Sequence, residues 1–223
     1  MKRFLFAGYR NWALRVYHFL IETFPEHEFL LVRTPEDFIK FIKSKVHIDA
    51  VICVGWSWII EKKIVDDYFI VGIHPSDLPN FAGGSPIQNQ ILNGVISTKN
   101  TLFRLTSVLD HGPIIKQIPL NLSDHISNIF DRIVLTSIVM LVEFVGKFPE
   151  EITYLEKESY AKRGIKKRIT PEASKITKEM LQNFSALELF NFIRCHEDPY
   201  PNAFYEDDTG KLLFKFCDFE KSE

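Results

Sequence analysis

Short apolar runs alternate with amphipathic segments through the first third of the chain, and this alternation constrains the fold more than any other feature. The runs at residues 3–9, 28–34, 49–56 and 69–76 are rich in β-branched and aromatic residues, as buried strands are. The segments between them, 11–24, 35–45 and 59–67, carry apolar residues at helical spacing. Strands that alternate with helices predict an α/β fold with a Rossmann-like, mostly parallel sheet covered by helices on both faces.

The rest of the chain indicates further strands and helices and then a smaller unit. It predicts a helix at 85–94, a strand near 100–108, a turn at 109–113, a strand at 114–120 and a long helix at 126–148. The stretch 157–176 is dense in lysine and arginine, which predicts a solvated surface connector. A helix at 185–195 and an Asp-Asp-Thr-Gly turn at 207–210 predict a helix followed by a hairpin. We therefore expect a catalytic domain over 1–160, and a linker with a small C-terminal subdomain over 161–223.

Composition excludes several classes of protein. The net charge of −2 over 223 residues gives no field that would attract a polyanion, so nucleic acid is not an expected partner. Three scattered cysteines are too few for a disulfide framework or a zinc site, which fits a reducing compartment. The longest apolar stretch, Val134–Val145, is broken by polar residues and is too short to span a bilayer. We expect a cytoplasmic protein with no signal peptide and no membrane segment.

Two segments place polar residues where the chemistry of an α/β protein usually lies, just after a strand. His74 follows the strand at 69–73 and opens the sequence HPSDLP, and Asp110 precedes a Gly-Pro turn. Each has a plain structural alternative, since a histidine before proline can order a loop and an aspartate often forms a turn. His111 would point away from Asp110 in an extended segment and is taken as a bystander.

Three motifs, HPSDLP at 74–79, GGSPIQ at 83–88 and LDHGPII at 109–115, occur in this order. Together they resemble the folate-dependent formyltransferases, a family that includes glycinamide ribonucleotide, methionyl-tRNA and sugar N-formyltransferases. The resemblance implies a formyl-transferring enzyme with 10-formyltetrahydrofolate as co-substrate, no metal, and His74 and Asp110 as catalytic residues. His74 would stabilise the oxyanion and shuttle a proton, while Asp110 would hold the imidazolium.

One position departs from the family pattern. The family has an asparagine two residues before the histidine, whereas this chain has Gly72, which offers no side-chain donor. Either another donor substitutes, or the chemistry is slower, or catalysis has been lost. Glycine at a strand end often marks close approach by a neighbour, so we expect a substitute donor, either from Ser57, Asn80 or Asn89 or from backbone N–H groups of the GGSP loop.

The resemblance also suggests which residues contact the ligands. The segment 54–60 corresponds to the loop that lines the pterin pocket, so the expected folate contacts are Trp56, Ser57, Trp58, Ile59, Ile60 and Asp110. Both tryptophans can instead be core residues. We expect folate in the groove between the loops 54–60 and 109–115, because both should leave adjacent strands at one sheet edge. Expected contacts to the acceptor substrate are Arg10, Asn11, Ser76, Asp77, Ser85 and Gln88, with loop-ordering hydrogen bonds as the alternative for each.

Among the family's branches, the segments 8–17, 77–91, 168–176 and 189–204 look most like sugar N-formyltransferases. The tRNA-formylating relatives are usually longer, and the purine-pathway relatives lack a similar tail. The resemblance therefore implies a UDP- or dTDP-linked aminodeoxysugar as substrate, used for surface polysaccharide. A non-catalytic folate- or sugar-binding protein and a formyltetrahydrofolate hydrolase remain alternatives. The sequence names neither the sugar nor the base, and a homodimer is one oligomeric state that it allows.

Overall fold

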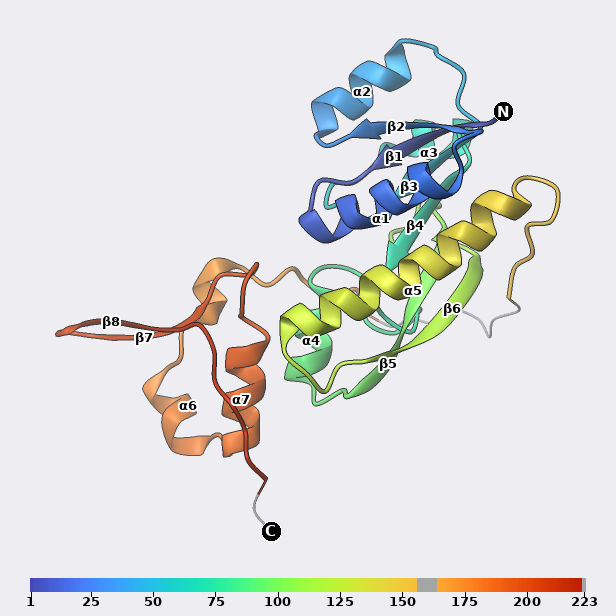
Figure 1. Cartoon of the computed structure of the whole chain (residues 1–223). Helices are drawn as coiled ribbons and strands as arrows, with labels where there is room; N and C mark the ends of the chain where they lie inside the picture. The colour runs from blue at the N-terminus through green and yellow to red at the C-terminus, as the bar shows by residue number, and fades with distance from the viewer. Residues whose placement is uncertain (156–163, 222–223) are drawn as a thin grey trace.

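The computed structural model describes residues 1–155 and 164–221. A six-stranded sheet with strand order β2-β1-β3-β4-β5-β6 forms the body of the protein (Figure 1). The pairs β1–β2, β1–β3 and β3–β4 are parallel, whereas β4–β5 and β5–β6 are antiparallel. The expected mostly parallel α/β sheet is therefore confirmed. The expected domain boundary at 160/161 lies outside the described residues.

The elements follow the alternation expected from the sequence. In chain order they are β1 (Arg3–Ala7), α1 (Asn11–Thr23), β2 (Glu28–Val32), α2 (Pro35–Lys43), β3 (Ala50–Cys53), α3 (Lys62–Asp67), β4 (Ile70–His74), α4 (Pro86–Leu92), β5 (Ser97–Arg104), β6 (Ile114–Asn121), α5 (Ile126–Lys147), η1 (Pro171–Ser174), α6 (Lys178–Asn183), α7 (Ala186–Arg194), β7 (Ala203–Asp207) and β8 (Gly210–Phe214). The strand expected near 100–108 starts and ends earlier, and neither η1 nor α6 was expected.

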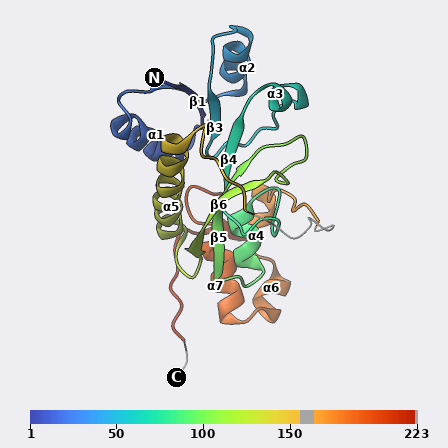
Figure 2. The same ribbon diagram turned by 90° about the vertical axis from the view of Figure 1, so that its right-hand side faces the viewer.

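Helices cover both faces of the sheet because the strands are apolar on both sides. In β1, Phe4 and Phe6 point into a core shared with α1 and α5, whereas Leu5 and Ala7 point into a second core with α2 and α3. Figure 2 shows α1 and α5 together on one side of the sheet. This packing holds the ends of β3 and β4 rigid, and the loops that follow those two strands carry most of the polar residues singled out above.

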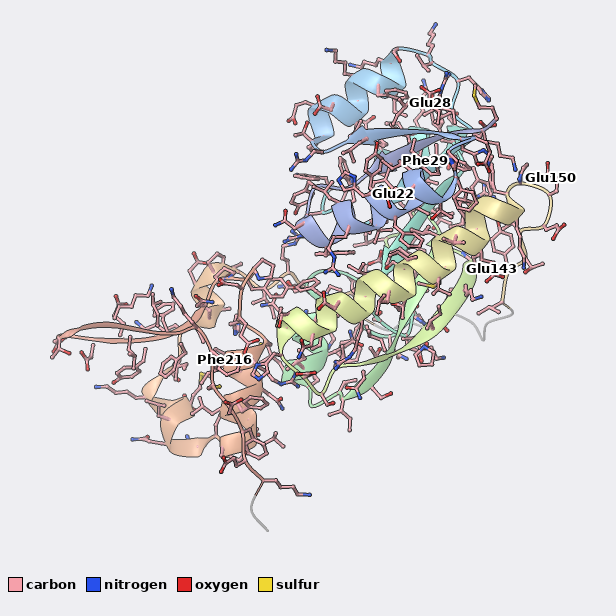
Figure 3. All side chains as sticks on the ribbon, in the orientation of Figure 1. Glu22, Glu28, Phe29, Glu143, Glu150 and Phe216 are labelled. Atoms are coloured by element: carbon pink, nitrogen blue, oxygen red, sulfur yellow. The ribbon has the colours of Figure 1, made fainter. Side chains whose placement is uncertain are left out.

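The C-terminal unit packs a helix, α7, beside the antiparallel hairpin β7–β8, which projects away from the rest of the chain (Figure 1). It docks on the start of α5. The buried guanidinium of Arg194 donates to the carbonyl oxygens of Leu122 and Asp124, at 2.7 and 2.6 Å. Phe216 stacks on His125, with 4.3 Å between ring centroids (Figure 3). These contacts orient the loop after α7 relative to the sheet.

Glu197 forms the most specific of these contacts. Its Oε2 accepts from the backbone N–H of Ile126 at 3.0 Å, and its Oε1 lies 2.6 Å from His125 Nδ1. The N-cap residue of α5, His125, makes no side-chain cap of its own. Glu197 therefore supplies from 71 residues away the acceptor that helix N-termini need.

Within the described residues, none of the helices combines the length and the apolar character that a membrane span requires.

We predict that Glu197→Ala destabilises the fold by about 1–3 kcal/mol, because the buried N–H of Ile126 and Nδ1 of His125 both lose their hydrogen-bond partner. Urea unfolding followed by circular dichroism measures the change. Glu22→Ala is the matched control, since Glu22 is exposed on α1 and its carboxylate has no hydrogen-bond or ion-pair partner among the described residues (Figure 3). Equal stabilities of the two variants would show that the cap contributes nothing.

Candidate functional site

His74 and Asp110 meet at the end of β4. His74 is the last residue of that strand, and Asp110 lies in the loop between β5 and β6. His74 Nδ1 lies 3.6 Å from Asp110 Oδ2, and the two side chains are only 9% and 13% exposed. His74 Nε2 lies 3.0 Å from the carbonyl oxygen of Phe81. The structure thus brings together two residues that are 36 positions apart.

The backbone of the Leu-Asp-His-Gly-Pro segment explains how Asp110 reaches this place. Asp110 has φ of 53°, a left-handed conformation that aspartate tolerates better than most residues. Its Oδ2 accepts from the backbone N–H of Gly83 at 2.8 Å. A side chain at Gly112 would lie 1.6 Å from the carbonyl oxygen of Arg104, so only glycine lets the loop return beside β5. The motif is therefore a geometric requirement for aiming the carboxylate.

The hydrogen bond to Phe81 selects the form of the imidazole that can act as a base. Because the Phe81 carbonyl can only accept, His74 donates from Nε2. In the neutral ring the lone pair then lies on Nδ1, the nitrogen that faces Asp110. A proton taken up at Nδ1 would be stabilised by the carboxylate beside it. The 3.6 Å separation is longer than a hydrogen bond and leaves room for adjustment when a ligand binds.

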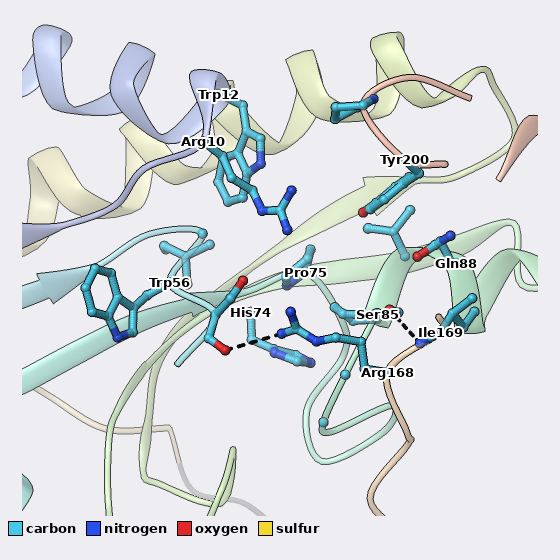
Figure 4. Close-up of a pocket in the computed structure, with 18 of the residues that line it drawn as sticks. Arg10, Trp12, Trp56, His74, Pro75, Ser85, Gln88, Arg168, Ile169 and Tyr200 are labelled. Carbon is cyan, nitrogen blue, oxygen red and sulfur yellow. Dashed lines mark hydrogen bonds between the residues drawn. The ribbon is translucent and has the colours of Figure 1, made fainter. Parts of the chain in front are cut away.

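Two cavities share this pair. The larger, about 580 Å³, lies between the end of β1, the loop after β4, residues 168–171 and the loop after α7 (Figure 4). The smaller, about 270 Å³, lies between the loop after β3 and the loop 105–110. His74 and Asp110 line both cavities. A reactant in one cavity can therefore meet a reactant in the other beside these two side chains.

The smaller cavity is mainly apolar and contains aromatic surface. Its walls include five of the six residues expected to contact folate, namely Trp56, Trp58, Ile59, Ile60 and Asp110; the sixth, Ser57, lines only the larger cavity. Trp56 and Trp58 pack edge to face, with 4.8 Å between ring centroids, and the buried indole N–H of Trp56 has no partner within residues 1–155 and 164–221. Burial raises the pKa of the Cys53 thiol in this wall to about 12, so it stays protonated. Apolar walls with one unpaired donor fit a flat heteroaromatic ring that carries an acceptor.

Folate was expected between the loops 54–60 and 109–115 because those loops should leave adjacent strands, and this reasoning was wrong. β4 lies between β3 and β5, and β5 runs antiparallel to β4. The loop after β5 therefore starts at the end of the sheet where β4 begins, and it folds back along the sheet to reach His74. Both loops nevertheless line the smaller cavity, because Leu109 and Asp110 reach it by this return path.

The region around Gly72 shows what occupies the space of the missing asparagine side chain. A Cβ built on Gly72 would lie 2.7 Å from Leu105 Cδ1 and 3.4 Å from the ring of Phe103. Leu105 and Gly72 both line the smaller cavity. The position is therefore filled by an apolar side chain from the neighbouring loop, and not by a polar donor.

The expected contacts to the acceptor substrate divide into two groups. Arg10, Ser85 and Gln88 line the larger cavity, as does Ser57. Asn11, Ser76 and Asp77 do not line it: Asn11 is exposed at the start of α1, and buried Ser76 bonds Asn80 O within the loop. Asp77 lies near Lys99 Nζ, at 3.3 Å, in a separate shallow cavity.

Of the suggested side-chain donors, Ser57 lines a cavity beside His74, and Asn89 and Asn80 do not. The amide of Asn89 donates to the carbonyl oxygens of Gly84 and Lys167, whereas the Ser57 hydroxyl accepts from Tyr9 and keeps its own proton to donate. Asn80 lies at the shallow cavity of Asp77 and lines neither of the two cavities beside His74. His111, taken as a bystander, also lines neither of them.

The charged stretch was predicted to be a solvated surface connector; most residues of 164–170 are exposed, but their backbone is hydrogen-bonded to the Gly-Gly loop. Lys166 pairs with the Gly-Gly loop: its N–H donates to Ala82 O and its carbonyl accepts from Gly84 N–H, both at 2.8 Å. The N–H of Ile169 donates to Ser85 Oγ at 3.1 Å (Figure 4). We call residues 164–170 the strap. The part of the stretch over 157–163 lies outside the described residues.

The residues of the larger cavity that were not singled out from the sequence include Trp12, Arg168, His196 and Tyr200. Burial raises the pKa of the Tyr200 phenol to about 12, although nearby Arg10 and Arg168 act to lower it. Burial lowers the pKa of His196, so its ring is neutral near pH 7. All four lie far in the sequence from HPSDLP. Only the aromatic and basic character of their segments could have indicated them.

Residues 1–155 and 164–221 contain no cluster of three or more histidine, cysteine, aspartate or glutamate side chains that could hold a metal ion.

Comparison with known proteins identifies relatives of this chain. Residues 32–141 match the family model described as formyl transferase. The chain is 31% identical over 170 residues to the methionyl-tRNA formyltransferase of Pseudothermotoga lettingae, an alignment covering 74% of this chain and 54% of that protein. The chain thus spans about half the length of the curated relatives it matches.

Solved structures share the fold. The methionyl-tRNA formyltransferase from Clostridium thermocellum superposes with a TM-score of 0.81 at 24% identity, covering 99% of this chain and 94% of that one. A sugar N-formyltransferase from a Shewanella species superposes with a TM-score of 0.75 at 18% identity, covering 99% of this chain and 100% of that one. HypX from Aquifex aeolicus in complex with tetrahydrofolic acid superposes with a TM-score of 0.75 at 17% identity, covering 95% of this chain and 37% of that one.

We predict that Gly72→Asn destabilises the protein by about 1 kcal/mol, because the new side chain must displace the end of the Leu105 side chain. Urea unfolding of four proteins measures this effect: wild type, Gly72→Asn, Leu105→Ala and the double variant. Since Leu105→Ala makes room, the double variant should lose less stability than the sum of the single changes. Strict additivity would show that Leu105 is not what fills the position.

Proposed function

This chain belongs to the formyl transferase family, and from that premise we propose that it transfers a formyl group from 10-formyltetrahydrofolate to the amine of a UDP- or dTDP-linked aminodeoxysugar for surface polysaccharide biosynthesis. The observation that carries the proposal is the His74–Asp110 pair at the junction of two cavities. Trp56 and Trp58 line both cavities, whereas Arg10 and Arg168 line only the larger one. This arrangement suits a two-substrate transfer beside one acid–base pair.

The smaller cavity is the proposed site of the folate. Trp56, Trp58 and the isoleucines of the same loop would contact the pterin, and the unpaired indole N–H of Trp56 would donate to its edge. HypX, which shares this fold over 37% of its chain, was solved in complex with tetrahydrofolic acid, which agrees with a folate ligand. The folate supplies the formyl carbon when it is bound.

His74 and Asp110 would manage the proton of the incoming amine. As the amine nitrogen bonds to the formyl carbon, His74 Nδ1 accepts a proton from that nitrogen, and Asp110 stabilises the resulting imidazolium. His74 then returns the proton toward the folate nitrogen, whose bond to the formyl carbon breaks. The same cation would stabilise the negative charge that develops on the formyl oxygen. No covalent bond to the protein is required.

Several features of the larger cavity support a small polar acceptor substrate. At about 580 Å³ the cavity has the size of small-molecule sites. Gln88 is 3% exposed and lines it, and its amide has no hydrogen-bond partner among the described residues. Unpaired polar groups in such a wall favour a ligand rich in hydroxyl and amine groups. The likeness to the Shewanella sugar N-formyltransferase agrees with this choice.

Methionyl-tRNA is the second candidate acceptor, because the curated relatives include methionyl-tRNA formyltransferases such as that of Pseudothermotoga lettingae. Against it stands the net charge of −2, which gives no overall attraction for RNA. Formyl transfer is therefore to be measured with both acceptor classes and 10-formyltetrahydrofolate: a panel of UDP- and dTDP-amino sugars, and methionyl-tRNA. Product from the tRNA alone would overturn the sugar assignment.

The same assay addresses two further alternatives that the sequence left open. A formyltetrahydrofolate hydrolase would release formate without any acceptor, and a non-catalytic binding protein would give no turnover at all. The proposal requires turnover that depends on the amino sugar.

We predict that His74→Asn keeps the fold and lowers kcat by about 10²–10⁴-fold, because the proton acceptor of the site is removed. Saturating both substrates separates this loss from weaker binding. His18→Asn is the control, since His18 is exposed on α1 and lines neither cavity. Near wild-type turnover of His74→Asn would exclude His74 from catalysis.

We further predict that Gly72→Asn leaves turnover unchanged or lowers it, because Leu105 occupies the space and an asparagine would narrow the smaller cavity. Steady-state kinetics with varied 10-formyltetrahydrofolate measures the effect. A rise in kcat of about tenfold or more, roughly 1.4 kcal/mol of barrier, would mean that the site lacks a donor and that nothing replaces it.

A further inference from the structure

The larger cavity has an unusual distribution of charge. Arg10 and Arg168 line it, and among the described residues the one acidic side chain in its lining is Asp110, which lies beside His74. Figure 4 shows the two guanidinium groups extending into the pocket from different elements, Arg10 from the end of β1 and Arg168 from the strap. The cavity therefore combines a positive region with a single carboxylate at its reactive end.

Neither arginine has a carboxylate partner among the described residues. Arg168 Nη2 donates to the carbonyl oxygen of Ser57 at 3.4 Å, near the limit of a hydrogen bond. The Arg10 guanidinium carbon lies 5.1 Å from the centre of the Tyr9 ring, a contact that leaves its N–H groups unused. Since guanidinium groups stay charged in proteins, this region favours an anion.

Buried polar atoms in the same wall provide a second, independent observation. Trp12 lines the cavity, and its buried indole N–H has no partner among the described residues. His196 is 1% exposed; its Nδ1 donates to Phe192 O at 2.8 Å, and its Nε2 likewise has no partner in the part of the chain that the structure describes. A neutral ring bonded in this way presents Nε2 as an acceptor. Such orphaned groups in a cavity wall are typical of sites completed by a ligand.

The start of α1 adds to the attraction for an anion. The N-cap of this 13-residue helix is Arg10, which makes no side-chain cap, and its first turn carries no acidic residue. The free N–H groups and the helix dipole therefore favour negative charge at the end of β1, close to Arg10 and Trp12.

The strap determines where Arg168 lies. A side chain on Gly83 would lie 2.4 Å from Lys166 O, and one on Gly84 would lie 2.6 Å from Arg168 Cα. The two glycines thus admit the strap backbone against the loop, where Lys166 and Ile169 hydrogen-bond on either side of Arg168. The backbone at Arg168 is fixed even though its side chain is exposed in the pocket.

We propose that Arg10 and Arg168, together with the indole N–H of Trp12, bind the phosphate groups of a nucleoside diphosphate in the larger cavity. The inference rests on the proposed function and names the part of the acceptor substrate that this wall recognises. Planar guanidinium forks match phosphate oxygens in pairs. The nucleoside would place a hydrogen-bond donor against Nε2 of His196.

Equilibrium binding tests this proposal without any turnover. Isothermal titration calorimetry compares UDP and dTDP with uridine and thymidine on the wild-type protein. The diphosphates should bind at least about tenfold more tightly than the nucleosides, a gap that should narrow as salt is raised. Equal affinities would overturn the proposal.

Single substitutions then assign the effect to the arginines. Arg10→Gln and Arg168→Gln should each weaken diphosphate binding about tenfold or more and leave nucleoside binding unchanged. Lys167→Gln is the matched control, because Lys167 is the next residue of the strap, carries the same charge and does not line the cavity. Unchanged affinity in both arginine variants, or an equal loss in Lys167→Gln, would contradict the assignment.

The phosphate site and the proposed function can fail separately. If the diphosphates bind through both arginines but no amino sugar is formylated, the phosphate site stands and the sugar assignment fails. If an amino sugar is formylated with kcat and KM unchanged in both arginine variants, the function stands and the phosphate site fails. A methionyl-tRNA acceptor stem that binds through these arginines while free UDP and dTDP do not would also overturn the proposal.

Discussion

The contact of the Asp110 carboxylate with the Gly83 backbone is the interaction on which the rest of the site depends. It joins the loop after β5 to the loop after β4, and it holds the carboxylate beside His74. The same loop then accepts the strap at Gly83 and Gly84. One carboxylate therefore orders the loop that positions both the proposed base and the segment carrying Arg168.

Glycine serves opposite purposes at different positions of this site. Gly83, Gly84 and Gly112 admit neighbouring backbone, which in each case would approach within 3 Å of an added Cβ. Backbone cannot move aside as a flexible side chain can, so these glycines are required for the geometry. At Gly72 the near neighbour is the end of the Leu105 side chain, which can move. The backbone therefore does not require glycine at position 72; whether a larger residue is accepted there depends on how the Leu105 side chain packs.

Periodicity and motifs predicted the sheet, the helices over its first 150 residues and the pairing of His74 with Asp110. They could not predict the direction of β5, because alternation of apolar residues is the same in parallel and antiparallel strands. The docking of the strap was also not predicted, because it depends on backbone hydrogen bonds, which any residue type can form. Its lysines and arginines indicated solvent exposure, and only the tertiary structure shows that Arg168 lines a cavity. Trp12, His196 and Tyr200 converge on that cavity from two separate segments, which no local pattern reveals.

The charges of the larger cavity would also orient its ligand. Asp110 repels a phosphate and attracts an amine, whereas Arg10 and Arg168 do the reverse. Solvent weakens these interactions where a side chain is exposed, as at Arg168, so they bias the orientation rather than fix it. A nucleotide-linked amino sugar that entered in the reversed direction would place its phosphates beside Asp110 and its amine beside the arginines, so both terms would oppose binding. Because His74 lies at the Asp110 end, the favoured direction is also the one that brings the amine to Nδ1. The electrostatics that would bind the substrate would therefore select the reactive orientation without a separate contact to the amine.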